Sequence, residues 1–307
     1  MAFDSTLPAV DMLYVSLNNN TIVSYDTTGN DSMTIAATMT TFASTNLSAP
    51  RGLAFDTSGN LYAANYGNSS ISKFNSSGGY ISNITSNLSN SSGLAFDSLG
   101  NLYVSTGWGN DKILKITPAG SVTSFATGLN YPFGIAFGSD GFLYCATMLD
   151  HSIVTIAGNG LVTNFATNIG GNDFGYGIWD LVFEKKGYLY ADTYGGSESG
   201  VISRIAPDGT VSNFVSSRSP EDIYGYGNGL MGMAIDNDGY IYVANGSGFA
   251  ISKISPTGDI VCNFSTGGVY PRYLTFAPSV ITVPEPSTYS LACIATSVMA
   301  YLARRRK

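Results

Sequence analysis

The chain has 307 residues and a formal net charge of −7 at pH 7, because Asp and Glu outnumber Lys and Arg by 21 to 14. This acidic balance argues against a nucleic-acid-binding protein, which needs a basic face. A hydrophobic content of 44% is sufficient for a folded core and excludes a largely disordered chain. Only 11% of the residues are charged, while Gly, Tyr and Phe are frequent, so we predict an all-β fold with many turns.

A repeated sequence occupies most of the chain. Its first copy, Gly-Leu-Ala-Phe-Asp-Thr-Ser-Gly-Asn-Leu-Tyr at residues 52–62, returns in altered form from residues 93, 134, 180 and 232. The turn glycines of the five copies lie about 40–50 residues apart, which is the period of a propeller blade. Each copy predicts two strands joined by a tight Asp-x-x-Gly-Asn hairpin, and two further strands follow it.

The two ends of this array supply the parts of one more blade. Residues 271–277 match the first strand of the repeat, whereas residues 13–16 and 22–25 match its second and third strands. We therefore predict a six-bladed β-propeller over residues 1–282, closed by pairing of the N-terminal and C-terminal strands. Closure removes the exposed strand edges that an open array of sheets would leave.

The order of these elements resembles the NHL repeat over about residues 10–280. It also resembles the wider set of six-bladed propellers that includes gluconolactonase/regucalcin-like and streptogramin-lyase-like proteins. The resemblance implies the fold and leaves the activity open. NHL units typically carry Asp directly after the second strand, but here that position is never a carboxylate and holds Leu17, Asn65, Thr106, Thr147, Thr193 and Asn245. A turn network of the NHL type is therefore altered in this chain.

Residues 283–307 form a separate segment with the features of a targeting signal. A Pro-Glu-Pro motif is followed by an apolar run over residues 289–303, which is short for a stable spanning helix of about 20 residues. We expect a short apolar helix there, and the basic cluster after it favours the cytoplasmic side, so the propeller would lie outside. The motif residues and the basic residues are Pro284, Glu285, Pro286, Arg304, Arg305, Arg306 and Lys307.

This tail resembles the PEP-CTERM sorting signal of Gram-negative bacteria. The resemblance implies an exported protein, a transient membrane anchor, and cleavage near the motif by a membrane protease of the exosortase type. It also implies delivery to the cell surface or the extracellular matrix. An ordinary C-terminal tail anchor is the alternative. Residues 1–6 show no basic or apolar export signal. Either the true start lies upstream, or the signal has been removed, or the protein is not exported, and we favour an upstream start or a removed signal.

Six residues that precede the first strands of the blades are expected to lie near one mouth of the central channel. They are Arg51, Ser92, Phe133, Trp179, Met231 and Arg272. Among them, Arg51, Phe133, Trp179 and Arg272 could bind a sugar or an anionic glycan through aromatic stacking and forked hydrogen bonds. Ordinary rim residues are the alternative interpretation.

A metal site is a second hypothesis for the channel. Asp180 stands where the other complete blades have Gly, and with Asn65 and Asn245 it could bind Ca²⁺ through oxygen atoms. The resemblance to the metal-dependent lactonases implies a Glu, Asp and Asn set at this place, although no Glu of this chain can be matched to it. The alternative is that Asp180 accepts hydrogen bonds from turn amides near Trp179.

The remaining candidate residues are expected to have structural roles or to form loops. His151 is the only histidine and has no evident catalytic partner, so we interpret it as a surface residue rather than a general base. Cys145 and Cys262 fall in different blades and are expected to be free, buried thiols, while Cys293 lies in the tail. Two Gly-rich and aromatic segments, residues 170–177 and 224–229, are either binding loops or long linkers.

Two functions are therefore compatible with the sequence. The first is a non-enzymatic surface or matrix module that binds an exopolysaccharide or a surface protein. The second is a metal-dependent lactonase or esterase-like hydrolase. The fold alone does not decide between them.

Overall fold

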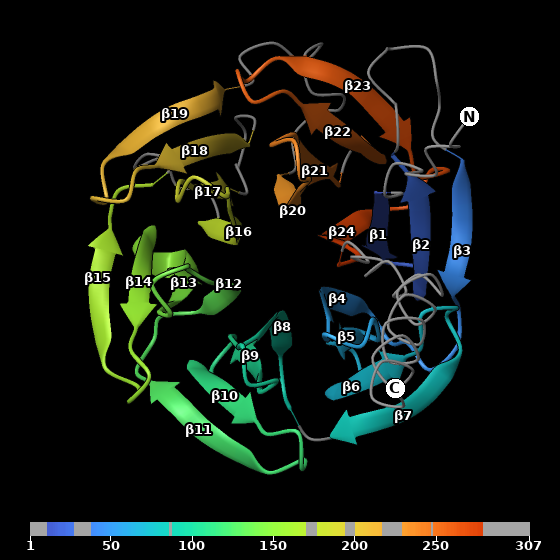
Figure 1. The fold of residues 1–307 in the computed structure, drawn as a ribbon, viewed down its shortest axis with the longest axis horizontal. Coiled ribbons are helices and arrows are strands. Elements are labelled where there is room, and N and C mark those ends of the chain that lie inside the picture. Colours follow the sequence, from blue (N-terminus) through green and yellow to red (C-terminus); the bar gives the residue numbers. More distant parts are fainter. Residues whose placement is uncertain are drawn as a thin grey trace, which may run out of the picture. The chain divides into compact units, whose positions relative to one another are not determined.

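The computed structural model describes residues 11–27, 38–85, 88–169, 177–193, 200–216, 229–246 and 248–278. These residues belong to one compact unit, Val10–Pro278. Within them, six four-stranded antiparallel sheets surround a central axis as the blades of a propeller (Figure 1). The predicted all-β, six-bladed fold is therefore confirmed. The predicted C-terminal helix and the sorting segment lie outside the described residues.

The strands are named in chain order, and each blade is given from its inner to its outer strand. Blade 1 consists of β24 (Pro271–Phe276), β1 (Met12–Leu17), β2 (Thr21–Asp26) and β3 (Met39–Ala43). Blade 2 consists of β4 (Pro50–Phe55), β5 (Leu61–Asn65), β6 (Ser70–Phe74) and β7 (Tyr80–Thr85). Blade 3 consists of β8 (Ser91–Phe96), β9 (Leu102–Thr106), β10 (Lys112–Ile116) and β11 (Val122–Thr127).

Blade 4 consists of β12 (Pro132–Phe137), β13 (Leu143–Thr147), β14 (Ser152–Ile156) and β15 (Val162–Ala166), with the 3₁₀ turn η1 (Met148–Asp150) after β13. Blade 5 consists of β16 (Ile178–Phe183), β17 (Leu189–Thr193), β18 (Val201–Ile205) and β19 (Val211–Ser216). Blade 6 consists of β20 (Leu230–Ile235), β21 (Ile241–Asn245), β22 (Ala250–Ile254) and β23 (Ile260–Ser265).

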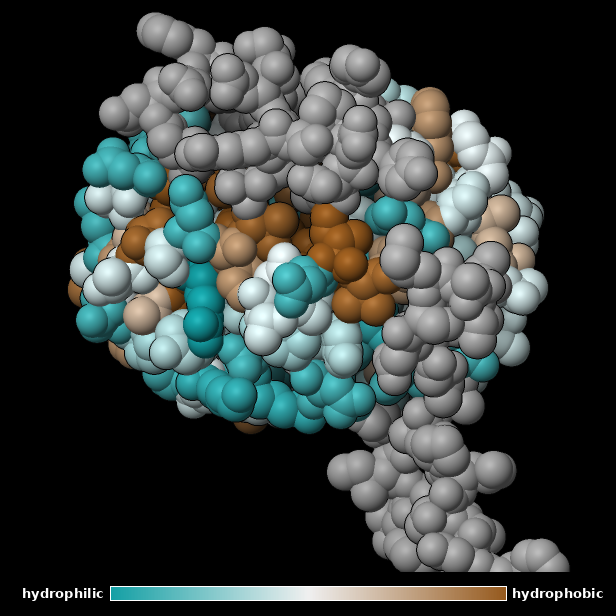
Figure 2. Space-filling view, turned by 90° about the horizontal axis from the view of Figure 1, so that it is seen from above, coloured by the Kyte–Doolittle hydropathy of each residue, from teal (hydrophilic) through white to brown (hydrophobic). Residues whose placement is uncertain are grey.

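Exposure increases from the channel to the rim of the ring. The second strands β5, β9 and β13 are buried along their whole length, because each blade packs between two neighbours. The outer strands β3, β7 and β11 are mostly exposed or half-buried. Seen from the top edge of Figure 1, the rim shows hydrophilic side chains with hydrophobic ones visible between them (Figure 2). Among the described residues, no helix is long and apolar enough to cross a membrane.

Blade 1 closes the ring with strands from both ends of the described chain. β24 pairs antiparallel to β1, with Val15 opposite Leu274 and Tyr14 opposite Thr275. Val15 and Leu274 are both buried in one core cluster. The predicted closure by N-terminal and C-terminal strands is therefore confirmed.

Neighbouring blades are joined by a repeated aromatic contact. In five blades, the Tyr of the second strand packs edge to face against the Phe that ends the next inner strand. The pair Tyr62 and Phe96 joins blades 2 and 3, with ring centroids 5.0 Å apart. The same contact recurs at Tyr14–Phe55, Tyr103–Phe137, Tyr144–Phe183 and Tyr242–Phe276. Each such pair contributes about 1 kcal/mol beyond the area that it buries.

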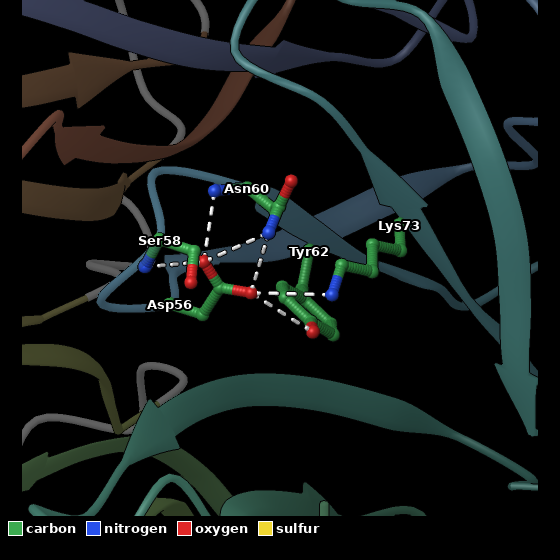
Figure 3. A network of polar contacts seen from close by, with 5 residues as sticks. All are labelled: Asp56, Ser58, Asn60, Tyr62 and Lys73. Carbon is green, nitrogen blue, oxygen red and sulfur yellow. Dashed lines mark hydrogen bonds and ion pairs between the residues drawn. The ribbon is translucent and has the colours of Figure 1, made fainter.

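The Asp-x-x-Gly-Asn hairpin that joins the inner and second strands of blade 2 forms a polar network. Asp56 accepts hydrogen bonds from the backbone N–H groups of Ser58 and Asn60, both at 2.9 Å, and from the Tyr62 hydroxyl at 3.2 Å. Lys73 of β6 forms an ion pair with the same carboxylate at 3.2 Å (Figure 3). Burial opposes ionisation, but the hydrogen bonds from Asn60 and the contact with Lys73 lower the pKa of Asp56. The repeated Asp and Tyr of the sequence therefore stabilise the blades.

Cys145 and Cys262 are buried thiols, and within the described residues neither forms a disulfide, as predicted. In the hairpin of blade 5, Glu184 forms ion pairs with Lys186 and Arg204 and accepts a hydrogen bond from Tyr190.

Candidate functional site at the channel mouth

Each inner strand has the same irregularity near its first residue. In β4 the register with β5 passes directly from Pro50 to Leu53, so two residues are left out of the ladder. The inner strands of all the other blades skip at the same place. Bulges of this kind re-aim side chains. We call the first of the two skipped residues in each blade the channel-mouth cluster: Arg51, Ser92, Phe133, Trp179, Met231 and Arg272.

These six residues are the ones that the sequence placed at the mouth, but their position in the strands differs from the prediction. They were expected to precede the inner strands, and they lie inside them. Strand β4 begins at Pro50, which can open a strand because its missing N–H is not needed there. The structure brings most of the cluster into mutual contact, as the following distances show.

Arg51 connects blades on both sides of the channel. Its guanidinium carbon lies 3.7 Å from the ring centroid of Tyr66 and 5.8 Å from the centroids of Phe133 and Trp179. Its Nη1 donates a hydrogen bond to Ser92 Oγ at 3.1 Å. Blades 2 and 5 lie opposite each other in the ring, so the approach of Arg51 to Trp179 crosses the mouth of the channel (Figure 1).

Aromatic rings extend this contact outward over blades 3 to 5. The centroids of Phe133 and Trp179 are 4.6 Å apart, and both residues are buried against Met148. Trp108 contacts Phe133 at 6.2 Å and Tyr131 at 5.4 Å between centroids. Trp108 remains 40% exposed. Tyr66, Trp108, Tyr131, Phe133 and Trp179 therefore form an aromatic cluster around Arg51, which we call the aromatic belt. Phe133 and Trp179 are its buried members, and Trp108 is its most exposed ring.

Two residues of the aromatic belt have unusual backbone conformations. Trp108 has φ 55° and Tyr131 has φ 54°, in the left-handed region that bulky residues rarely adopt. Such conformations cost free energy and persist only where the surroundings impose them. At Trp108 the result is a large ring held partly exposed beside the channel-mouth cluster.

The second skipped residue of each inner strand faces the neighbouring blade. Four blades have Gly there, as expected for a crowded axis, and a Cβ at Gly134 would lie 2.5 Å from the Asp180 Cα. Blades 5 and 1 instead carry Asp180 and Tyr273 at this position. Both residues line a cavity of about 120 Å³ in the channel, together with Gly52 and Gly93.

Asp180 belongs to a pair of buried carboxyl groups that the sequence did not predict. Its Oδ2 accepts a hydrogen bond from the Met233 N–H of blade 6 at 2.9 Å, and its own N–H donates to Asp192 Oδ1 at 2.7 Å. Asp180 thus accepts a hydrogen bond from the next blade, and the Leu181 N–H, two residues after Trp179, also interacts with it. Burial raises the pKa of Asp180 to about 7. Burial and the nearby Asp180 raise the pKa of Asp192 well above its usual value.

Asp192 occupies a position that is a serine in two other blades. Ser105 accepts the Gly93 N–H at 2.7 Å and donates to the Phe133 carbonyl of the next blade. Ser16 in the same way accepts the Tyr273 N–H and donates to the carbonyl of Arg51. These side chains satisfy the N–H groups that the bulges remove from the ladder. Asp192 could therefore have been found in the sequence as a carboxylate at the next-to-last residue of a second strand, where two other blades have Ser.

Tyr273 and Arg272 complete the polar part of the mouth. The Tyr273 side chain is 3% exposed, and its hydroxyl has no hydrogen-bond partner among the described residues. The Nε atoms of Arg51 and Arg272 are buried, and they too have no partner in the part of the chain that the structure describes. Burial lowers the pKa of both arginines, but a guanidinium remains charged at neutral pH. Within the described part of the chain, neither guanidinium forms an ion pair with a carboxylate.

The residues proposed for Ca²⁺ do not form a common site. The Asn65 Oδ1 accepts the Ser48 N–H at 3.0 Å, and the Asn245 Oδ1 accepts the Gly248 N–H at 2.9 Å. Each amide therefore holds a loop of its own blade, whereas Asp180 contacts blade 6. Among the described residues, no group of three or more His, Cys, Asp or Glu could hold a metal ion. The arrangement of these three residues does not fit the oxygen cage that Ca²⁺ requires.

The other candidates lie away from this cluster or outside the described residues. His151 follows η1 in a left-handed conformation and is partly exposed. Nearly all of the segment at residues 170–177 and nearly all of that at residues 224–229 lie outside the described residues, as does the motif Pro284-Glu285-Pro286. Sequence reasoning missed Tyr66, Trp108 and Tyr273, because the equivalent positions of the other blades hold different residue types.

Comparison with known proteins identifies the tail and the fold. The family model described as the PEP-CTERM protein-sorting motif matches residues 282–307. A comparison with curated protein sequences found no significant match.

Several solved structures resemble the propeller at low sequence identity. A chain of the nidogen/laminin complex aligns with a TM-score of 0.72 and 17% identity, covering 88% of this chain and 99% of that one. Virginiamycin B lyase from Staphylococcus aureus aligns with a TM-score of 0.57 and 20% identity, covering 73% of each chain. The calcium-binding protein regucalcin from Agrobacterium tumefaciens aligns with a TM-score of 0.58 and 18% identity, covering 75% and 78%. At these identities the likeness shows the fold alone.

The sorting motif adds information about location. A PEP-CTERM signal indicates an exported protein of a Gram-negative bacterium whose precursor is anchored in the membrane at its C-terminus, and it implies processing by an exosortase. The chain is thus similar in fold to the regucalcin-like and streptogramin-lyase-like propellers and carries a PEP-CTERM sorting signal.

Proposed function

We propose that the protein is an exported binding module that holds a glycan against the aromatic belt and the channel-mouth cluster. The observation that carries the proposal is the exposed ring of Trp108, which contacts Tyr131 and the buried Phe133 beside Arg51. Sugar rings stack on aromatic faces through their C–H bonds, and guanidinium groups donate hydrogen bonds to sugar oxygens. The sorting motif supports a location at the cell surface or in the matrix, where an exopolysaccharide is a suitable ligand.

The structure of the mouth favours a binding module over the metal-dependent hydrolase. Asn65 and Asn245, which a calcium-assisted mechanism would need in the channel, are engaged by loop N–H groups. The two carboxyl groups present, Asp180 and Asp192, are buried and hydrogen bonded to inner-strand N–H groups. Such groups are suited to holding blades together.

The test replaces one exposed ring of the aromatic belt. Trp108→Ala removes a side chain that is 40% exposed, so the fold should tolerate the change. Loss of one stacking contact of about 1 kcal/mol should weaken binding to an immobilised matrix polysaccharide by about fivefold. Phe142→Ala is the matched control, because Phe142 is also 40% exposed but lies in a hairpin at the opposite end of an inner strand.

The result is read from retention of the full-length protein on the polysaccharide. Weaker retention of Trp108→Ala with unchanged retention of Phe142→Ala supports the proposal. Equal retention of both variants and the parent would refute it. Retention on a surface protein with none on any polysaccharide would show that the ligand is a protein and would also refute it.

A further inference from the structure

The channel mouth concentrates positive charge and hydrogen-bond donors without a matching anion. Arg51 and Arg272 are close enough for the charge of Arg272 to lower the pKa of Arg51 beyond the effect of burial. Both have a buried Nε without a partner, and in the described part of the chain neither has a carboxylate partner. A buried charge without a partner is strongly unfavourable, so an anion that binds here would gain free energy from both groups.

A third donor, the Tyr273 hydroxyl, lies close enough to interact electrostatically with both Arg51 and Arg272. Tyr273 lines the channel cavity, is 3% exposed, and its hydroxyl has no partner among the described groups. Burial and the charge of Asp180 raise the pKa of Tyr273, so the hydroxyl keeps its proton and can only donate to an anion. An unused hydroxyl inside a protein costs about 1–3 kcal/mol, which a bound acceptor would recover.

We propose that Arg51, Arg272 and the Tyr273 hydroxyl hold a carboxylate group of the ligand, so the glycan at the mouth is an acidic one that contains uronic acid units. This inference rests on the proposed function and names the class of glycan. The planar fork of a guanidinium matches a carboxylate through two parallel hydrogen bonds. The aromatic belt lies next to these donors and would stack the ring that carries the carboxylate.

The nearby carboxyl groups are compatible with an anionic ligand. Burial raises the pKa of Asp180 to about 7, so in mildly acidic solution this group is neutral and does not repel an incoming carboxylate. Burial raises the pKa of Asp192 as well, and its Oδ1 is already engaged by the Asp180 N–H. At pH 6 Asp180 therefore does not neutralise the guanidinium groups of Arg51 and Arg272.

The test compares a charged sugar chain with its neutral counterpart. Calorimetric titration of the full-length protein at pH 6 uses an oligogalacturonate, the same oligomer with its carboxyl groups reduced to alcohols, and a sulfated dextran oligomer. The oligogalacturonate should bind at least about tenfold more tightly than the reduced oligomer, as expected for charge-assisted hydrogen bonds. The sulfated oligomer should bind more weakly than the oligogalacturonate.

Three variants locate the effect. Arg272→Ala should weaken oligogalacturonate binding by about tenfold or more and leave binding of the reduced oligomer unchanged. Tyr273→Phe removes only the hydroxyl and should weaken oligogalacturonate binding by about fivefold without loss of thermal stability. Arg204→Ala is the charge-matched control, because Arg204 pairs with Glu184 near the opposite end of the blade, and binding should not change.

Different results would overturn the two proposals separately. Equal affinity for the charged and the reduced oligomer, or tighter binding of the sulfated one, would overturn the carboxylate site and leave glycan binding intact. An unchanged affinity of both Arg272→Ala and Tyr273→Phe for oligogalacturonate would also overturn it. Absence of binding to all three oligomers would overturn the carboxylate site. If the protein were also not retained on any neutral matrix polysaccharide, the proposed function would be refuted as well.

Discussion

The buried carboxyl pair predicts that the replacement Asp180→Asn stabilises the propeller at high pH. Asp180 is 8% exposed and its Oδ2 accepts the Met233 N–H at 2.9 Å. The amide oxygen of Asn can accept the same hydrogen bond. The substitution therefore removes a titrating group without removing the contact between blades 5 and 6.

The size of the effect follows from proton linkage. Burial raises the pKa of Asp180 in the folded protein to about 7, whereas an unfolded Asp has a pKa of about 3.9. Between these values the folded state binds a proton that the unfolded state has lost, so the free energy of unfolding falls as the pH rises. The loss is complete above about pH 7 and amounts to about 4 kcal/mol in total. Between pH 5 and pH 8, the parent should lose about 3 kcal/mol through this group, and Asp180→Asn should lose none of it.

The assay is urea unfolding at pH 5 and pH 8, followed by the fluorescence of Trp108 and Trp179. Asp192→Asn should change the pH dependence in the same direction, because the charge of Asp180 contributes to the raised pKa of Asp192. Asp208→Asn is the control, since Asp208 is an exposed turn residue and its pKa is lowered by the N–H of Thr210. If Asp180→Asn destabilised the protein at pH 8, Asp180 would be ionised and paired with a cation, and the reasoning would be wrong.

The other predictions concern packing, closure and processing. Gly134→Ala should destabilise the fold by about 1–3 kcal/mol in thermal melts, because the new Cβ would lie 2.5 Å from the Asp180 Cα, whereas Gly158→Ala, with open space around it, should be neutral. Removal of residues 270–282 deletes β24 and should abolish cooperative unfolding, and a truncated chain that melts like the parent would contradict closure of the ring. The intact mass of protein recovered from the cell surface or medium should lack the segment after about residue 283, and a full-length mass would rule out processing.

Much of the fold could be predicted because the repeat encodes it locally. The turn at Gly59 requires a positive φ, which is 78° in the structure, and the hairpin closes with a hydrogen bond from the Asp56 N–H to the Asn60 carbonyl. The apolar residues on either side then define the strands. Because every blade repeats this pattern, even the shared blade could be assembled from residues 13–25 and 271–277.

The candidate site could be predicted only in part. The repeat located Arg51, Phe133, Trp179 and Arg272 at the mouth, because their place in each blade is the same. It did not show that Arg51 crosses the opening to approach Trp179. That contact depends on the diameter of the closed ring, which no single repeat specifies.

The sequence by itself determined the blades, their number, the strand that closes the ring and the sorting tail, since each depends on short stretches of chain and their spacing. Only the tertiary structure decided that Asp192 lies beside Asp180, that Asn65 and Asn245 hold separate loops, and that the buried Tyr273 lies near Arg51 and Arg272. The physical reason is that bulges in the inner strands turn these side chains across blade boundaries, where partners are set by ring closure and not by neighbours in the sequence.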